Sequence, residues 1–309
     1  MQQIIIKKFN LSLFKSLVFE SLETHNNLML EIDKDLIRSL SLSGTTSLMK
    51  ICYTKFADFD KDYDAERYKN MELFNLYVLK GDNFKKYLEL YSVLSDVELK
   101  FNLQNSELSD ARKIATHISI KGITTLGTTL DVTFNLTTEE LMTNQVEDYS
   151  TVIDKLKVDT GIESQFSLNK SKYSETKDII KKLHSTVSNN SNFVEFAINN
   201  TSVKIKDKVF DLEFKDCIVN YVDDSETIDF KILKSDFNIL GKHNWQIFTN
   251  NTNDKIVLLT KIKSIEVENP TEIIVGSIIT KTNSAQAFDN DGGEEDEDYG
   301  IDLAYYENI

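Results

Sequence analysis

Lysines on segments with helical spacing are the side chains of this chain that are best placed for chemistry. Lys177 and Lys181 lie four residues apart, and Lys182 follows directly. Residues four apart lie on one face of a helix. Five more lysines occupy or flank similar segments: Lys15, Lys85, Lys86, Lys234 and Lys242. Lysine is a flexible point charge, so such a stripe suits contact with phosphates without reading of bases.

The charge balance works against a simple nucleic-acid interpretation. The chain has a formal net charge of −15 at pH 7, and an acidic protein repels DNA through its overall field. However, residues 282–309 hold nine acids and no base, so that −6 remains for the rest of the chain. If the lysine-bearing helices line one surface, they form a positive stripe on a negative body. The alternative, that surface helices carry lysine only for solubility, remains open.

The sequence predicts no catalytic residues, no cofactor and no metal site. It contains no phosphate-binding glycine loop, no dinucleotide fingerprint and no zinc-protease or nucleophile-elbow motif. Asp60, Asp62 and Asp64 alternate as in a calcium loop, but the glycine of such a loop is missing. Cys52 and Cys217 lie in separate strand-like runs, and we expect both to be buried, reduced thiols. The four histidines show no ligand spacing.

The hydrophobic periodicity predicts an α+β protein. Helices are expected over 10–23 and 171–187 and from Asp82, the last with Phe84, Tyr87, Leu88 and Tyr91 facing inward. Alternating runs predict strands over the following ranges: 28–32, 36–42, 48–56, 73–79, 97–103, 111–120, 128–136, 193–198, 203–205, 209–214, 218–222, 228–233, 245–248 and 256–262. A short helix is expected over 235–240 and an edge strand over 273–279. The charged segment 57–70 is expected to form a surface loop.

The chain contains an internal repeat. Leu79-Lys80-Gly81-Asp82 follows one strand pattern, and Leu233-Lys234-Ser235-Asp236 follows another. Upstream of each motif lie a lysine-bearing helix and a two-stranded pattern. Internal repeats constrain architecture strongly. We therefore expect two similar domains, 1–137 and 161–281, joined by a connector over 138–160 and followed by a disordered acidic tail over 282–309.

This order of elements resembles the DNA polymerase sliding clamps of the phage T4 type, which are related in fold to the eukaryotic and archaeal ring clamps. The resemblance covers roughly residues 4–262 and rests on order rather than on a diagnostic motif. The segments that carry it are Phe9 to Leu22, Leu28 to Leu42, Leu73 to Leu94, Tyr173 to Val187, Phe193 to Ile205 and Ile228 to Phe237. The insertion 57–70, the connector 137–160 and the chain beyond about 265 depart from the family pattern.

The resemblance implies two sliding-clamp-like domains, each with two helices packed on antiparallel sheet. It also implies a ring that encircles duplex DNA without sequence preference, with the eight lysines facing the DNA, and that serves a DNA polymerase and a clamp loader. A late-transcription partner, such as an RNA polymerase co-activator or sigma-like factor, is a further expectation. Six domains close such rings, so two domains per subunit imply a homotrimer of about 106 kDa, three times 35.5 kDa.

The tail ends in a cluster of apolar and aromatic residues after an acidic run. This cluster, formed by Ile301, Leu303, Tyr305 and Tyr306, is typical of short docking peptides. We expect it to dock into a groove on its own ring or on a partner; a tail that only improves solubility is the alternative.

Two other functions remain open at the level of sequence. One is a structural, virion-associated or adaptor protein with a duplicated α+β domain, which predicts no ring. The other is an enzyme of unrecognised class, which predicts a deep polar pocket with perturbed ionisable groups. The chain has no long apolar run and no signal-like start, so we expect a cytoplasmic protein without membrane contact, in a host cytoplasm if a bacteriophage encodes it.

Overall fold

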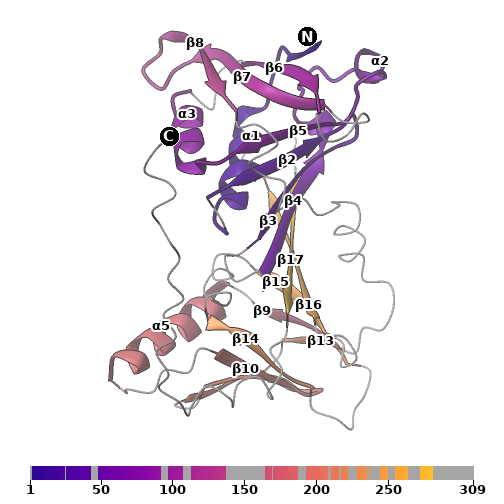
Figure 1. The fold of residues 1–309 in the computed structure, drawn as a ribbon. Coiled ribbons are helices and arrows are strands. Elements are labelled where there is room, and N and C mark those ends of the chain that lie inside the picture. The colour runs from indigo at the N-terminus through magenta and orange to yellow at the C-terminus, as the bar shows by residue number, and fades with distance from the viewer. Residues whose placement is uncertain are drawn as a thin grey trace, which may run out of the picture.

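The computed structural model shows an α+β chain that is rich in strands (Figure 1). It describes the following residues: 2–24, 26–42, 48–91, 97–106, 113–136, 164–168, 170–186, 193–207, 210–215, 217–221, 228–234, 237, 244–249, 255–263 and 272–280. The predicted connector and the acidic tail lie outside them.

The first half runs from a short strand through one helix to two groups of strands. Its elements are β1 (Gln2–Ile6), α1 (Leu11–Ser21), β2 (Leu28–Ile32), β3 (Leu36–Leu42), β4 (Leu48–Lys55), the 3-10 turn η1 (Phe56–Asp58), α2 (Ala65–Tyr68), β5 (Phe74–Val78), α3 (Gly81–Glu89), β6 (Glu98–Asn105), β7 (Lys113–Ile123) and β8 (Thr129–Asn135). The strands β5, β2, β3 and β4 are neighbours, as are β1, β6, β7 and β8.

The second half contains one long helix among its strands. Its elements are β9 (Ser164–Leu168), α5 (Lys170–Thr186), β10 (Phe193–Ile198), β11 (Ser202–Asp207), β12 (Phe210–Lys215), β13 (Ile218–Tyr221), β14 (Ile228–Leu233), β15 (Trp245–Thr249), β16 (Lys255–Lys263) and β17 (Glu272–Thr280). The strands β12, β11, β10 and β14 form a separate sheet. Only Phe237 of the short helix predicted over 235–240 is described.

A long sheet joins the two halves through β4 and β17. These strands pair in antiparallel register from Leu48 opposite Ile279 to Tyr53 opposite Ile274, and β17 also pairs with β16 along its whole length. The edge strand predicted over 273–279 is therefore a central strand (Figure 1). The described strands consequently extend to Thr280, within the second domain predicted over 161–281 and past residue 265, where the sequence departs from the family pattern.

The helix α1 forms because its apolar residues recur at helical spacing behind a polar cap. The Asn10 side chain accepts a hydrogen bond from the Leu13 N–H (3.1 Å) and caps the first turn. Leu13, Phe14 and Leu17 are fully buried, and the helix packs on β3 and β4. Each such side chain contributes roughly 1.5–3 kcal/mol when it is buried. The helix is thereby fixed on one face of the sheet.

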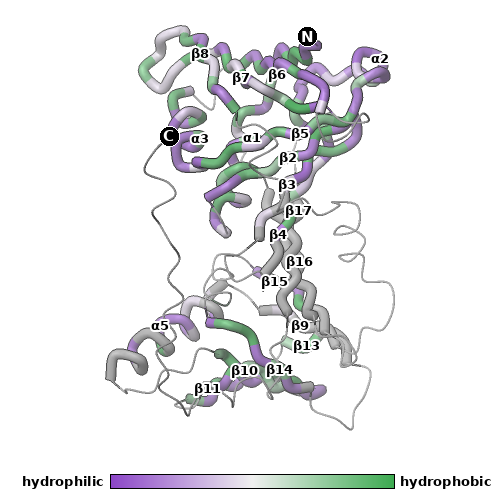
Figure 2. The backbone as a smooth tube through the Cα atoms, in the orientation of Figure 1, coloured by the Kyte–Doolittle hydropathy of each residue, from purple (hydrophilic) through white to green (hydrophobic). Residues whose placement is uncertain are grey.

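The insertion after β4 is not a surface loop throughout, as the sequence predicted. Phe56, Phe59 and Tyr68 are buried, and the Tyr68 hydroxyl donates to the buried carboxylate of Asp60 (2.6 Å). Burial and this carboxylate both raise the pKa of Tyr68. Figure 2 shows hydrophilic positions (purple) gathered around α2, whereas β2 and α1 carry apolar stretches (green). The insertion therefore adds a small aromatic core beneath a charged surface.

The insertion also closes the outer edge of β1. Within the described sheet β1 pairs only with β6, and unpaired edges invite association with other strands. The Arg67 guanidinium donates to the carbonyl of Ile5 (2.8 Å) and lies over the Tyr68 ring. In the second half, β13 pairs with β9 at the corresponding edge.

Two tyrosine hydroxyls from the α3 segment hold β7 and β8 together. The Tyr87 hydroxyl donates to the Val132 carbonyl (2.8 Å) and accepts from the Ile120 N–H (3.0 Å). The Tyr91 hydroxyl donates to the Ile120 carbonyl (2.7 Å). Burial raises the pKa of both tyrosines, so both remain donors at neutral pH. The position of β8 therefore depends on α3.

Replacing Tyr87 with phenylalanine is expected to lower the free energy of unfolding by about 1–3 kcal/mol, because the Ile120 N–H and the Val132 carbonyl lose a buried partner. Urea unfolding monitored by circular dichroism measures the change. Tyr63→Phe is the matched control, since the Tyr63 hydroxyl makes only an exposed contact of 3.5 Å with Lys34. Equal losses in the two variants would contradict a special role for the Tyr87 hydroxyl.

Candidate nucleic-acid interface

The outward face of α1 carries one charged residue. Ser12, Lys15, Ser16 and Phe19 are half-buried, and they fall on the side of the helix that faces away from the sheet. The Lys15 ammonium donates to the Tyr91 carbonyl beyond α3 (3.1 Å). Burial lowers the pKa of Lys15, and the Glu89 carboxylate opposes this shift. Lys15 thus adds positive potential but is also engaged within the protein.

The outward face of α3 has mixed charge. Lys86 is exposed and lies four residues after Asp82 and three before Glu89, which are exposed as well. Lys85 is half-buried. Residues at these spacings are neighbours on the helix surface. The structure therefore surrounds Lys86 with acids, which weakens any attraction of this helix for phosphates.

The helix α5 carries two exposed lysines among those of the prediction. Lys177 and Lys182 are exposed, whereas Thr176 is fully buried and its hydroxyl donates to the Lys172 carbonyl (2.8 Å). Lys181 belongs to the same helix, four residues after Lys177. Asp178 is exposed as well. Glu175 is also exposed, so that three lysines against two acids leave residues 175–182 of α5 with a net charge of +1.

Lys15 of α1 and Lys181 of α5 occupy equivalent positions, whereas Lys177 and Lys182 correspond to Leu11 and Ser16. Ile32 opposes Ile37 at the end of one hairpin, and Ile198 opposes Val203 at the end of the other, an offset of 166 in both strands. The same offset carries Lys15 to position 181 and Ser16 to 182. In Figure 1, α3 and α5 lie on the same side of the strands β4 and β17. That these lysines line one DNA-facing surface stays a prediction.

Other predicted site residues contribute less or cannot be placed. Lys234 directly follows β14 and is half-buried. Lys242 lies outside the described residues, as do all four residues of the predicted docking cluster: Ile301, Leu303, Tyr305 and Tyr306.

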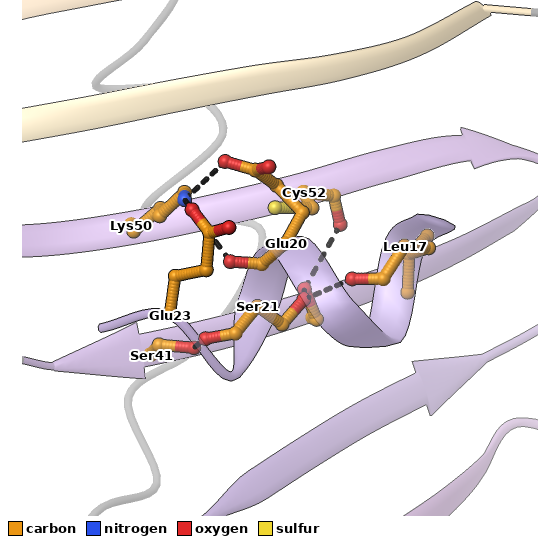
Figure 3. A network of polar contacts seen from close by, with 8 residues as sticks. Leu17, Glu20, Ser21, Glu23, Ser41, Lys50 and Cys52 are labelled. Atoms are coloured by element: carbon orange, nitrogen blue, oxygen red, sulfur yellow. Dashed lines mark hydrogen bonds and ion pairs between the residues drawn. The ribbon is translucent and has the colours of Figure 1, made fainter. Parts of the chain in front are cut away.

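Sequence reasoning missed a buried ion pair between α1 and β4 (Figure 3). The Lys50 ammonium contacts the Glu20 carboxylate and the Glu20 carbonyl (3.0 Å), and it lies 3.7 Å from Glu23. The Lys50 and Glu20 side chains are only 3% and 7% exposed. The alternation of the strand could have revealed this burial, because Lys50 and Cys52 are two residues apart and therefore point to the same face of the sheet as each other. Burial raises the pKa of the Cys52 thiol to about 11, so the thiol stays protonated and inert at neutral pH.

The described residues contain little that resembles an enzyme site. The carboxylates of the predicted Asp60–Asp64 alternation diverge, because Asp60 is buried beside Tyr68 and Arg67 while Asp62 pairs with Lys8 (3.0 Å). A pocket lies at the edge of β1, β6 and β7, lined by Gln2, Leu103, Gln104, Asn105 and Lys113. In it the Lys113 ammonium is paired with Glu72 and Gln2. None of the described helices is long and apolar enough to cross a membrane.

Comparison with known proteins assigns the chain to no family. No protein-family model matches the chain, and no curated protein matches its sequence. The arrangement of strands, helices and lysines is therefore the basis for a functional conclusion.

Proposed function

We propose that the chain is a DNA sliding clamp, a processivity factor whose subunits join head to tail into a ring around duplex DNA. The observation that carries the proposal is a set of strand pairs that occurs in both halves and in which the described strands β8 and β12 each have one partner where β17 and β4 have two. The exposed Lys177 and Lys182 of α5, with Lys181 on α5 and its counterpart Lys15 on α1, support the DNA side of the proposal.

Six strand pairs of the first half have counterparts in the second, whereas the parallel pair β5–β7 and the pair β13–β9 have none among the described strands. The antiparallel pairs β1–β6, β6–β7 and β7–β8 correspond to β9–β15, β15–β16 and β16–β17. The pairs β2–β3, β3–β4 and β2–β5 correspond to β10–β11, β11–β12 and β10–β14. The register of one pair agrees as well. Val194 is the counterpart of Leu28, and Ile232 is the counterpart of Val78; Leu28 opposes Val78, and Val194 opposes Ile232. We take the chain as a duplicated clamp-like domain.

This equivalence gives the junction between subunits. Within the chain, β17 pairs with β4. Their counterparts are β8 and β12, and each of these strands has only one partner among the described strands. Pairing β8 of one copy with β12 of the next repeats the internal junction. Because the two edges differ, the contact is heterologous and generates a ring if the rotation closes.

A ring of this kind acts by topology rather than by bond-making. Three subunits supply six domains, and their lysine-bearing helices face the enclosed duplex. Weak contacts between lysines and phosphates permit sliding and show no sequence preference. A DNA polymerase tethered to the ring then stays on its template, and a loader opens and closes the ring. The acidic remainder of the body limits adhesion of DNA to the outside of the ring.

The junction can be tested by mixing two sets of cysteine variants. Asp131 lies on the exposed side of β8, and Asp211, Glu213 and Lys215 lie on the exposed side of β12. Asp131→Cys is mixed with Asp211→Cys, Glu213→Cys or Lys215→Cys under oxidising conditions. We expect disulfide-linked pairs only in the mixtures, with one register dominant, because an antiparallel pair places only matching positions within reach.

The native thiols do not interfere, because both are buried. Light scattering of the unmodified protein should give about 106 kDa, three times 35.5 kDa. Cross-linking of Asp131→Cys with itself, or a monomer that never supports processive synthesis with polymerase and loader, would overturn the proposal.

A further inference from the structure

The turn between β7 and β8 is built rigidly. The Thr124 N–H donates to the Thr128 carbonyl (2.8 Å), and the Gly127 N–H donates to the Thr124 carbonyl (2.9 Å). The Thr124 hydroxyl oxygen also accepts from the N–H groups of Leu126 and Thr128 (3.2 Å each). Gly127 has a φ of +81°, a conformation that favours glycine. These contacts fix the direction of the turn.

The turn is anchored to the end of α3. The Thr125 N–H donates to the Leu90 carbonyl (3.3 Å), and Thr124 forms an isolated bridge with Tyr91. Leu126 lies in this anchored turn and is 89% exposed. Leu90 and Ile123 are exposed beside it, at 45% and 44%. Three of the five exposed large apolar side chains of the described residues thus gather at one tip. We call Leu90, Ile123 and Leu126 the apolar tip.

We infer that the apolar tip is an anchor for a second copy of this chain, in which Leu126 packs beside the end of β12. The inference rests on the proposed function. A preorganised apolar side chain adds affinity because little conformational freedom is lost when it binds. A rigid turn with a fully exposed leucine has that form, and an exposed apolar cluster marks an interaction site more often than a lone residue does.

The position of the apolar tip indicates that a second copy of the chain is the partner that covers it. Thr129, which starts β8, is only three residues after Leu126, so the tip continues the edge that the proposed junction uses. An antiparallel pairing, as in β4 and β17, brings the start of β8 to the end of the next copy's β12 at Lys215. Phe214 and Ile218 at that end are only partly buried, and they offer apolar surface to the leucine.

The test compares the dissociation constants of the assembled protein by analytical ultracentrifugation. We expect Leu126→Thr to weaken each subunit contact by about 10- to 100-fold, the range for burial of one large aliphatic side chain. Leu126→Met should stay within about threefold of the unmodified protein, because it conserves volume and polarity. Ile5→Thr is the matched control, since Ile5 is 37% exposed on β1, away from the proposed junction. Circular dichroism should show intact folds.

Two results would overturn the inference while the clamp proposal stands. One is an unchanged dissociation constant for Leu126→Thr in a protein whose β8–β12 cross-link forms. The other is unchanged assembly with loss of polymerase stimulation, which would assign the tip to the polymerase. A loss of affinity that Ile5→Thr shares would also count against it. If the unmodified protein does not assemble and the mixed cysteine variants do not cross-link, the proposed function fails first.

Discussion

If the chain is the proposed clamp, reversal of the α5 lysines is expected to abolish processive DNA synthesis while the ring still assembles. Lys177, Lys181 and Lys182 together contribute three positive charges per subunit. Changing all three to glutamate alters the charge of each subunit by six units and replaces attraction to phosphates by repulsion. Each lost phosphate contact lowers the dependence of log affinity on log salt by about 0.9. We expect the affinity of the ring for DNA to fall by at least about 100-fold, because proteins that lose several phosphate contacts to salt lose affinity on that scale or more.

Primer-extension length at increasing salt measures this loss, and light scattering shows whether the ring remains. The matched control reverses Lys61, Lys69 and Lys121, which are exposed on other parts of the first half. That variant has the same net charge. If both triple variants lose processivity equally, the overall field is responsible and α5 has no special position. Full processivity of the α5 variant would contradict a DNA-facing helix.

Removing the Lys50 side chain is expected to be the most destabilising single change. The Lys50→Ala variant leaves the Glu20 carboxylate buried without its cation, and breaking a buried pair in this way costs about 3–5 kcal/mol. A domain has only about 5–15 kcal/mol of stability in total. Because β4 also pairs with β17, the loss should loosen the junction between the two halves. The midpoint of urea unfolding measures the effect.

Two variants separate the ion pair from other effects of Lys50→Ala. The double variant Glu20→Gln with Lys50→Met removes both charges and keeps most of the volume, so it should recover much of the loss. Lys69→Ala breaks an exposed pair with Glu66 (2.8 Å; 60% and 78% exposed) and should cost at most about 1 kcal/mol. A double variant as unstable as Lys50→Ala would show that packing, rather than an orphaned charge, controls this region.

Local elements were predictable because their periodicity is strong. The helix predicted over 10–23 is α1, and the helix predicted over 171–187 is α5. The four residues predicted to face inward from the third helix are all buried: Phe84, Tyr87, Leu88 and Tyr91. Apolar residues at helical spacing must find a core, and the sequence alone shows that spacing.

The connections between distant elements were not predictable. An apolar run such as 272–280 has the same sequence pattern whether the strand lies at the edge or at the centre of a sheet. The pairing of β17 with β4 could therefore not be predicted from the residues of β17 alone. The burial of Phe56, Phe59 and Tyr68 escaped notice because these aromatics have no regular spacing. For the candidate interface, no pattern in the sequence indicated that the Lys15 ammonium donates to the Tyr91 carbonyl, because that contact joins residues 76 positions apart.

The pairing of β4 with β17 places a constraint on biosynthesis. At about 5–20 residues per second, the 145 residues from 136 to 280 take roughly 7–29 s to synthesise after β8 is complete. During that interval the nascent first half has both β4 and β8 open, and β4 resembles the strand that β8 is proposed to join. Neighbouring ribosomes on one message would then hold chains capable of pairing wrongly. On the proposed function, late completion of β17 would make translation speed, as well as sequence, a determinant of correct assembly.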